Sequence, residues 1–245
     1  MAHVIDFSGK RALVTGGASG IGYGIAVALA EAGAEVTITA RSEESLAACE
    51  TKTPYGELEA VRLDVADDKA IDTLLEDFGD LDFLVNSAGT IVRAGGEYEI
   101  AKFQHVMDIN LTGTLRMCHA CLPKLAMRRG AVVNIASMMS YFAAPHAPAY
   151  GASKTAIVSL TRSLAVAWAE HHVRINAIAP GWIDTKLARP ALEDPDRGPK
   201  IMARLPMKRW GTPADMGGTA VFLCSPDAAY LTGVTIPVDG GYSAM

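Results

Sequence analysis

RALVTGGASGIG, residues 11–22, joins a short apolar run to a glycine-rich turn and the start of a helical pattern. The run predicts a buried strand, and apolar residues then recur at helical spacing up to a stop at Gly33. A strand, a turn and a helix N-terminus in this order form a cradle for phosphate, because backbone N–H groups and the positive helix end point at one place. The spacing Thr15-Gly-x-x-x-Gly-x-Gly22 therefore predicts a variant dinucleotide-binding turn. A turn without a ligand is the alternative, and the flanking elements argue against it.

Strand-like apolar runs alternate with helical patterns along the rest of the chain. Such alternation predicts a parallel sheet with helices on both faces, and right-handed crossovers make it a doubly wound, Rossmann-type α/β fold. Ligands of this fold bind at the carboxyl ends of the strands. We expect one domain over residues 1–245, with strands at 12–15, 35–40, 59–63, 83–86, 132–136, 174–178 and 235–238.

Residues 185–210 break this alternation, and they contain Pro190, Pro195, Pro199 and Pro206. A long insertion interrupted by proline is typical of a lid or binding loop, so we expect a substrate loop here.

The composition argues against several classes of function. Half of the 245 residues are apolar and the net charge is −5, without the basic face that nucleic-acid binding needs. No apolar run reaches the roughly 18 residues of a membrane span, and Asp6 lies where a signal peptide has its apolar core. We expect a cytoplasmic protein that binds neither nucleic acid nor a membrane.

The four cysteines are too few and too scattered for a disulfide framework. Cys118 and Cys121 have the spacing of a redox motif, but they lie inside a long helical pattern at 103–127. Reactive thiols typically lie at a helix N-terminus. We therefore expect two helix-packing residues, with neither redox chemistry nor a metal site.

Tyr150-Gly-Ala-Ser-Lys154 places a phenol and an ammonium group one turn apart on a helix face. The pKa of a free tyrosine is about 10, and a cation beside it favours the phenolate and lowers that pKa. Ser137 adds a hydroxyl at the end of the apolar run 131–136. Together these residues predict proton transfer, whereas Tyr-x-x-x-Lys alone is also compatible with a solvated helix face.

The motifs together resemble those of the single-domain short-chain dehydrogenases/reductases. The resemblance covers residues 10–242 and rests on Thr15-Gly-x-x-x-Gly-x-Gly22, Asn86-Ser-Ala-Gly89, Ser137, Tyr150-x-x-x-Lys154 and Pro180-Gly181 in this order. It implies an enzyme that transfers a hydride between a nicotinamide and a ketone or secondary alcohol. In the motif Asn86-Ser-Ala-Gly89, Ser87 replaces the second asparagine that the family usually carries. The replacement is small and polar.

The resemblance implies a cofactor site along the carboxyl edge of the sheet. Asp64-Val65 would contact the adenine, and the segment 180–183 would close over the nicotinamide. The expected cofactor-binding residues are Gly16, Ser19, Gly20, Ile21, Gly22, Arg41, Ser42, Asp64, Val65, Asn86, Ala88, Gly89, Tyr150, Lys154, Pro180, Gly181, Ile183 and Thr185.

Ala40-Arg41 favours NADP(H) over NAD(H). An acid after the second strand binds the adenosine ribose, whereas an arginine there accepts a 2′-phosphate. Ala40 stands where NAD-preferring relatives carry aspartate. Because Glu43 and Glu44 follow closely, NAD(H) stays possible, and an ordinary exposed charge is the alternative for Arg41.

The same resemblance implies the catalytic roles. Tyr150 exchanges a proton with the substrate oxygen, Ser137 orients that oxygen, and Lys154 lowers the pKa of the tyrosine and binds the nicotinamide ribose. Asn110 matches a helix asparagine that holds a water between the lysine and solvent.

The expected substrate-binding residues are Arg93, Met138, His146 and Trp182. Arg93 falls where sugar-acid dehydrogenases of the family carry arginine, and a guanidinium there would bind a carboxylate through two hydrogen bonds. A loop arginine that meets solvent is the alternative. A small carbonyl or alcohol substrate is expected, with a sugar acid or a hydroxy or keto acid as the favoured class.

Two other functions stay open. Arg209-Trp-Gly-Thr-Pro213 equally resembles 3-oxoacyl-thioester reductases, whose acidic carrier protein needs a basic docking face that 128–129 and 171–172 supply only in part. A non-catalytic nucleotide sensor is disfavoured because the tyrosine and lysine are both present. The helices expected at 103–127 and 150–171 are apolar enough to bury a partner, so a homo-oligomer (tetramer or dimer) is expected by analogy.

Overall fold

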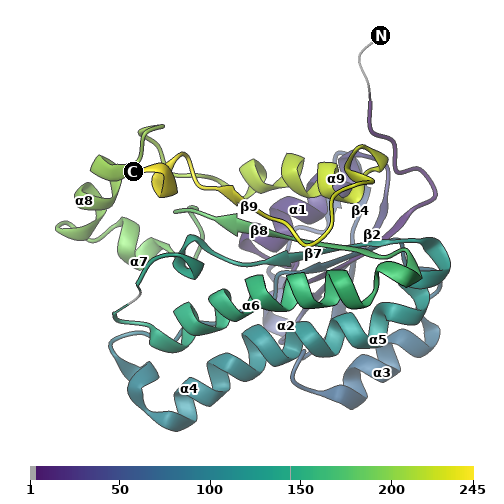
Figure 1. The fold of residues 1–245 in the computed structure, drawn as a ribbon, viewed down its shortest axis with the longest axis horizontal. Helices are drawn as coiled ribbons and strands as arrows, with labels where there is room; N and C mark the ends of the chain where they lie inside the picture. The colour runs from purple at the N-terminus through teal and green to yellow at the C-terminus, as the bar shows by residue number, and fades with distance from the viewer. Residues whose placement is uncertain (1–3, 144) are drawn as a thin grey trace.

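A doubly wound parallel sheet forms the centre of the protein (Figure 1). The computed structural model describes residues 4–143 and 145–245, and within them seven parallel strands form one sheet in the order β5-β2-β1-β6-β7-β8-β9. The strand order reverses between β1 and β6, which confirms the predicted α/β fold. The strands are β1 (Arg11–Thr15), β2 (Glu35–Ala40), β5 (Glu59–Arg62), β6 (Phe83–Asn86), β7 (Ala131–Ile135), β8 (Arg174–Pro180) and β9 (Thr235–Val238).

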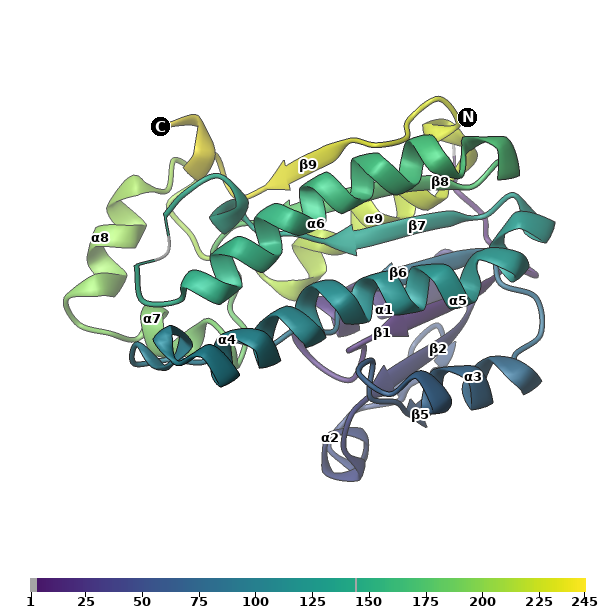
Figure 2. The ribbon, with the colours of Figure 1, turned by 60° about the horizontal axis from the view of Figure 1, so that its bottom comes forward.

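Helices cover both faces of this sheet. The helices are α1 (Gly20–Glu31), α2 (Glu43–Ala47), α3 (Asp68–Asp77), α4 (Ile100–Met107), α5 (Gly113–Arg128), α6 (Pro148–Ala167), α7 (Arg189–Leu192), α8 (Arg197–Arg204) and α9 (Gly217–Cys224). Figures 1 and 2 show α1 and α9 on one face and α3, α5 and α6 on the other. The short helices α7 and α8 lie beyond the carboxyl ends of β7 and β8.

Alternation along the strands builds two core layers. In β1, Val14 packs in the cluster that contains Ile25 of α1, whereas its neighbour Leu13 packs in the cluster that contains Met117 of α5. All four side chains are fully buried. Since successive side chains of a strand point to opposite faces, an apolar run without polar interruptions requires helices on both sides.

The predicted strands agree with the observed ones to within two residues at each end. A small antiparallel hairpin, β3 (Lys52–Thr53) and β4 (Gly56–Glu57), was not predicted. Its four residues are partly or fully exposed, so the pattern of apolar residues carries no signal for it.

The predicted helix at 103–127 is wrong in its continuity. A π-helical turn, Asp108–Thr112, separates α4 from α5. The turn widens the helix by one residue at Asn110, whose side chain is buried and bonds away from the helix to Thr90 and Ser153. Such local widening is frequent at functional sites, and periodicity alone does not reveal it.

The segment 185–210, expected as a substrate loop, is partly helical. It contains α7 and α8. Pro190 lies in the first turn of α7 and Pro199 in the first turn of α8, where a helix does not need the missing N–H group. Two of the four prolines in the segment thus lie at helix starts, whereas Pro195 and Pro206 lie outside the two helices. The role of the segment in substrate binding stays a prediction.

Cys118 and Cys121 are buried in α5. Burial raises the pKa of the Cys118 thiol to about 12 and raises that of Cys121 as well. Neither thiol is therefore activated, as expected for packing residues. In the described part of the chain, no group of histidine, cysteine and acidic residues has the arrangement of a metal site, and no helix is long and apolar enough to cross a membrane.

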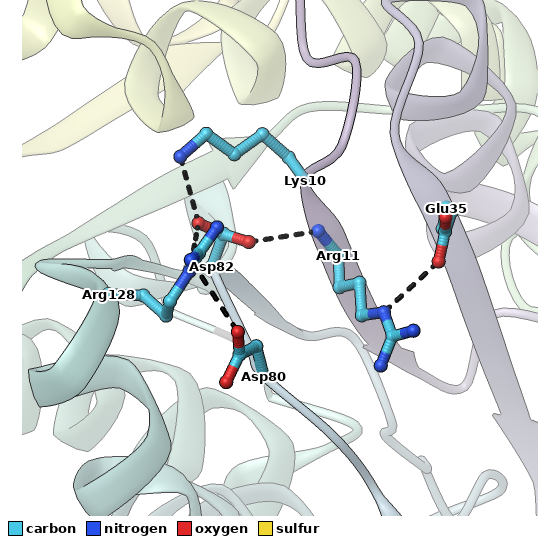
Figure 3. Close-up of polar contacts among 6 residues, drawn as sticks. All are labelled: Lys10, Arg11, Glu35, Asp80, Asp82 and Arg128. Carbon is cyan, nitrogen blue, oxygen red and sulfur yellow. Dashed lines mark hydrogen bonds and ion pairs between the residues drawn. The ribbon is translucent and has the colours of Figure 1, made fainter.

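An ion cluster ties the amino ends of the strands together (Figure 3). The side chain of Asp82 is only 2% exposed and accepts hydrogen bonds from Lys10 Nζ at 3.0 Å, Arg11 N at 3.0 Å and Arg128 Nε at 3.2 Å. Arg128 also pairs with Asp80 at 3.5 Å. We call these five residues the amino-end ion cluster, and they fasten β1, the start of β6 and the end of α5 to one another.

Candidate active site

The glycine turn lies at the carboxyl end of β1. Gly16 and Gly20 have φ angles of +64° and +55°, a region that favours glycine. A Cβ atom on Gly16 would lie 2.8 Å from the backbone of Ala88, and one on Gly22 would lie 2.5 Å from the carbonyl oxygen of Gly16. Gly22 therefore lets α1 pack closely on the turn itself.

The N-terminus of α1 is open toward a cleft. Its N-cap residue, Ser19, makes no side-chain capping bond, and the first turn carries no acidic residue. The orphan N–H groups of such an end attract an anion. The turn and the helix end thus fit the diphosphate of a dinucleotide. The cleft, about 230 Å³, is lined by Gly16, Ser19, Gly20, Ile21, Ser87, Gly89, Ile135, Tyr150, Lys154, Thr185, Lys186 and Leu187.

A second cavity of about 230 Å³ continues from the same turn toward β2 and β5. Arg41 lines it and makes no ion pair with any described residue. Ser42 also lines it, but its hydroxyl accepts from the Ser45 N–H at 3.2 Å and so caps α2. The Asp64 carboxylate, half-buried, accepts from the Ala66 N–H at 3.0 Å. The expected residues Val65, Ala88 and Gly89 also line this cavity.

The side chain of Asn86 does not line either cavity. It is buried, and its amide donates to Asn134 Oδ1 at 2.9 Å and to Cys118 Sγ at 3.2 Å. It lies in the layer between the sheet and α5, because residues at the end of a strand alternate between the two faces. The bonds of this side chain hold β6, β7 and α5 together, so the expected cofactor contact of Asn86 stays a prediction that concerns its backbone.

The end of β8 forms another wall. Pro180 is the last residue of this strand, and a Cβ atom on Gly181 would lie 2.6 Å from the Cα atom of Asp239. Ile183 is buried and pairs as an isolated bridge with Gly211. Thr185 follows and lies against the glycine turn, since a Cβ atom on Gly20 would approach its methyl group to 3.3 Å.

Ser137, Tyr150 and Lys154 meet where these walls converge. Ser137 follows β7 and accepts from the Met139 N–H at 3.1 Å, while Tyr150 and Lys154 lie one turn apart on α6. Lys154 is buried, its Nζ donates to the carbonyl oxygen of Ile135 at 2.6 Å, and it lies 5.8 Å from the centroid of the Tyr150 ring.

Burial dominates the pKa values of this group. It raises the pKa of Tyr150, and a hydrogen bond with Ser137 opposes the rise. Burial also lowers the pKa of Lys154 to about 8. The Nζ atom of Lys154 binds the Ile135 carbonyl rather than the phenol oxygen, and the lowering of the tyrosine pKa by Lys154 stays a prediction.

Asn110 lies near Lys154 and connects the segment after β6 with α6. Its Oδ1 accepts from the Thr90 N–H at 2.7 Å, and its amide donates to the Thr90 carbonyl oxygen and to Ser153 Oγ, both at 3.0 Å. A Cβ atom on Gly89 would lie 3.4 Å from Asn110 and 3.8 Å from Lys154 Nζ. The asparagine thus joins the strand end after β6 to the helix that carries the tyrosine.

Glu97 is a fully buried carboxylate beside the same helix. One of its oxygens accepts from the Val92 N–H and the other from the N–H of Tyr150 itself, both at 2.9 Å. The positive end of α6 stabilises this anion. Its negative charge raises the pKa of Tyr150.

The third cleft, about 580 Å³, opens above Ser137 and Tyr150. The expected substrate residues Arg93, Met138, His146 and Trp182 all line it. The guanidinium of Arg93, however, donates to the carbonyl oxygen of Leu187, so it also holds the start of the 185–210 segment. This contact was not foreseen from the sequence.

Three functional candidates were missed. Lys186 lines the diphosphate cleft, Arg197 lines the cleft above the tyrosine, and Glu97 binds the catalytic helix. The two basic residues lie in the proline-containing segment, where no motif marks them. For Glu97, the one available signal was an acid within a turn rich in glycine, and such a signal is too common to be used.

Comparisons with known proteins agree with this geometry. A family model described as enoyl-(acyl carrier protein) reductase, which represents short-chain dehydrogenases/reductases, matches residues 16–243. The 2-dehydro-3-deoxy-D-gluconate 5-dehydrogenase of Dickeya dadantii is 37% identical, over 99% of this chain and 98% of the relative. The rhamnolipid-biosynthesis 3-oxoacyl-[acyl-carrier-protein] reductase of Pseudomonas aeruginosa is 38% identical, over 97% of both chains.

Among solved structures, a gluconate 5-dehydrogenase of Burkholderia cenocepacia in complex with NADP and tartrate is 32% identical, with a TM-score of 0.89 over 99% of this chain and 98% of that one. Sequence and fold thus agree with these proteins over nearly the whole length. The chain belongs to the short-chain dehydrogenase/reductase family, and it is an NAD(P)-dependent oxidoreductase that acts on an alcohol or carbonyl group.

Proposed function

We propose that the protein is an NADP(H)-preferring dehydrogenase of sugar acids or related hydroxy and keto acids. The observation that carries this proposal is the third cleft, where Ser137 and Tyr150 lie among guanidinium groups. The two hydroxyl groups can bind a carbonyl oxygen, and the guanidinium groups attract an anion. The cleft therefore fits a substrate that carries both a carbonyl or alcohol group and a carboxylate. The relatives named for 2-dehydro-3-deoxy-D-gluconate and gluconate support the same class.

The residues of the chain divide the chemistry among themselves. A bound nicotinamide supplies or accepts the hydride. Ser137 holds the substrate oxygen, and Tyr150 gives or takes the proton at that oxygen. Lys154 and Asn110 form the proposed route by which this proton reaches solvent through a water. Arg93 is proposed to bind oxygen atoms of the substrate with the N–H groups that its contact with Leu187 leaves free.

The cofactor preference rests on Arg41. This guanidinium lines the cavity proposed for the adenosine half and has no acidic partner among the described residues, whereas Ala40 offers no carboxylate to a ribose. A 2′-phosphate would supply the missing anion. Relatives crystallised with NADP support this preference.

Turnover with matched substrates tests the proposal. We expect NADP(H)-linked conversion of D-gluconate or 2-dehydro-3-deoxy-D-gluconate, followed by nicotinamide absorbance, at a kcat/KM well above that for acetoacetyl-CoA. The same assay with NAD(H) should give a lower kcat/KM. Faster reduction of acetoacetyl-CoA than of every sugar acid would contradict it.

A 3-oxoacyl-thioester reductase is the second candidate, and the 38% identity with the rhamnolipid enzyme favours it. The structure weakens the basic docking face that it needs. Arg128 is bound to Asp80 and Asp82, and His171 lies near Glu170. These residues also lie at the helix ends far from α7 and α8, so a carrier bound there would not face the cleft (Figure 1).

A homo-oligomer is part of the same proposal. Leu115 and Met127 of α5 and Val166 of α6 are exposed at 41%, 75% and 81%, and we propose that a partner subunit covers them. Light scattering behind gel filtration tests the state, and a monomer at micromolar concentration would contradict it. A cytoplasmic location stays a prediction.

A further inference from the structure

The third cleft carries a second guanidinium group besides that of Arg93. Arg197, the first residue of α8, lies on the wall formed by the 185–210 segment, together with Trp182. Its guanidinium lies 5.5 Å from the Trp182 ring centroid. It makes no hydrogen bond or ion pair through its side chain with any residue in 4–143 or 145–245, so its planar set of N–H donors is free.

Trp182 adds an independent observation. Its indole Nε1–H is buried and has no acceptor within the described part of the chain. A buried donor without a partner is costly, and sites built to bind a polar group are where such donors occur. The wall of the third cleft therefore contains a guanidinium group and, behind it, a buried indole N–H, and neither has a hydrogen-bond acceptor in the described part of the chain.

Arg204, two turns further along α8, shows what an arginine that only holds the helix looks like. It lies 4.3 Å from the ring centroid of Tyr242 and 5.7 Å from that of Phe142, and it does not line the cleft. Buried Ile201 and Leu205 also fix α8 against the protein. The helix is thus packed against the protein by other residues, whereas Arg197 contacts Trp182 in the wall of the cleft.

We propose that Arg197 and Trp182 form a carboxylate subsite opposite Ser137 and Tyr150. The subsite rests on the proposed sugar-acid function and specifies it: the substrate carries its carboxylate on a carbon remote from the carbon that reacts. The contact with the indole holds the guanidinium at the wall of the cleft. A guanidinium can bind a carboxylate through two parallel N–H donors, which lysine does not reproduce. A volume of about 580 Å³ accommodates a six-carbon acid between the two ends.

The variants Arg197→Met and Arg197→Lys test the subsite, with Arg204→Met as the matched control on the same helix. Two readouts are compared with NADP⁺ bound: the ratio of kcat/KM for D-gluconate to that for neutral D-gluconamide, and the affinity for D-tartrate against neutral D-threitol by calorimetry. We expect Arg197→Met to lower the acid-to-neutral ratio and the tartrate affinity by about 10- to 100-fold, because charged hydrogen bonds are lost. Arg197→Lys should restore only part of both, and Arg204→Met should leave the ratio unchanged.

The outcomes separate this inference from the proposed function. Unchanged ratio and tartrate affinity in Arg197→Met, or equal losses for acid and neutral ligands, overturn the subsite while gluconate turnover stands. If no sugar acid is turned over but tartrate binding still depends on Arg197, the subsite is supported and the sugar-acid function is wrong. Should Arg197→Met fail to fold, Arg197→Lys decides, since intact discrimination in that variant excludes a two-pronged contact.

Discussion

The two ends of the sheet differ in how far their charged side chains are paired within the protein. At the amino ends, the buried carboxylate of Asp82 is satisfied by three donors from separate elements (Figure 3). At the carboxyl ends, buried Lys154 donates to a carbonyl oxygen, and the guanidinium of Arg197 contacts the Trp182 ring but makes no hydrogen bond or ion pair with a described residue. The buried atoms Thr39 Oγ1 and Trp182 Nε1, which lack partners within that same part of the chain, also belong to residues that line the cavities there.

This difference distinguishes charges that stabilise the fold from charges that are available to bind a ligand. A charge whose partners all lie within the protein fixes the fold and has nothing left for a ligand. A charge or donor without a partner costs free energy in the empty site and regains it when a ligand supplies the missing group. The cation-rich carboxyl end is also where an anionic cofactor and an acid substrate are proposed to bind. Changes at the two ends should therefore affect different measurements.

Tyr150→Phe should have the largest effect. It removes one hydroxyl at the carboxyl end, and we expect kcat to fall by about 10²-fold or more because the proton donor is lost. The thermal unfolding midpoint and cofactor affinity should stay close to those of the wild type. The exposed Tyr141→Phe is the control. A near-normal kcat in Tyr150→Phe would remove this residue from the mechanism.

Arg41→Ala should weaken NADP(H) binding by about tenfold to a hundredfold, the value of a charged hydrogen bond to phosphate. NAD(H) binding should change little, since that cofactor has no 2′-phosphate. Fluorescence titration of both reduced cofactors measures the ratio. Arg62→Ala is the neighbouring control, because Arg62 Nε donates to the Arg41 carbonyl oxygen and lines no cofactor cavity. Equal affinity of the wild type for both cofactors would refute the preference.

Asp82→Asn should act on stability alone. It breaks the centre of the amino-end ion cluster, and we expect a loss of about 2 kcal/mol in the free energy of unfolding, since Lys10 and Arg128 are partly exposed and regain water. Urea unfolding measures the loss, and kcat/KM per folded molecule should not change. Glu35→Gln is the matched control: the Arg11–Glu35 pair is exposed, so its loss should cost roughly 0–1 kcal/mol. Equal losses in the two variants would contradict the distinction between buried and exposed pairs.

Glu97→Gln should have the smallest effect on rate and a specific effect on its pH dependence. The negative charge raises the pKa of Tyr150, so its removal should move the tyrosine-dependent limb of the pH–rate profile to lower pH. One of the N–H groups of Val92 and Tyr150 also loses its carboxylate acceptor. Glu99→Gln, at an exposed acid paired with Lys102, is the control and should not move the profile. An unmoved limb in Glu97→Gln would mean that Glu97 only caps α6.

The fold was largely predictable because its signals are local. The apolar runs end where turn residues begin, and parallel strands buried on both faces require helices between them. The glycines at 16 and 20 have the positive φ angles that the turn requires. The π-helical turn at Asn110 was not predictable, since it follows from a bond to Thr90, twenty residues away in the chain.

The positions of some site residues could be predicted from the sequence, whereas the contacts of others could not. Motif residues such as Ser137 and Tyr150 lie where a family spacing puts them, and the structure brings them to one cleft. The Asn86 side chain turned away from the cofactor cavities, and Arg93 bound a carbonyl of the 185–210 segment. In each case the deciding partner comes from a distant part of the sequence.

The sequence by itself determined the fold class, the glycine turn and the order of the catalytic motifs, because each depends on backbone preferences and on spacing along one element. Only the tertiary structure decided which charges have partners. Lys154 binds a strand carbonyl and Glu97 binds the N–H of Tyr150, whereas Arg197 stacks on Trp182 with its donors free. Hydrogen bonds and burial depend on distances of a few ångströms between elements far apart in the chain, and these distances exist only once the sheet and its helices have packed.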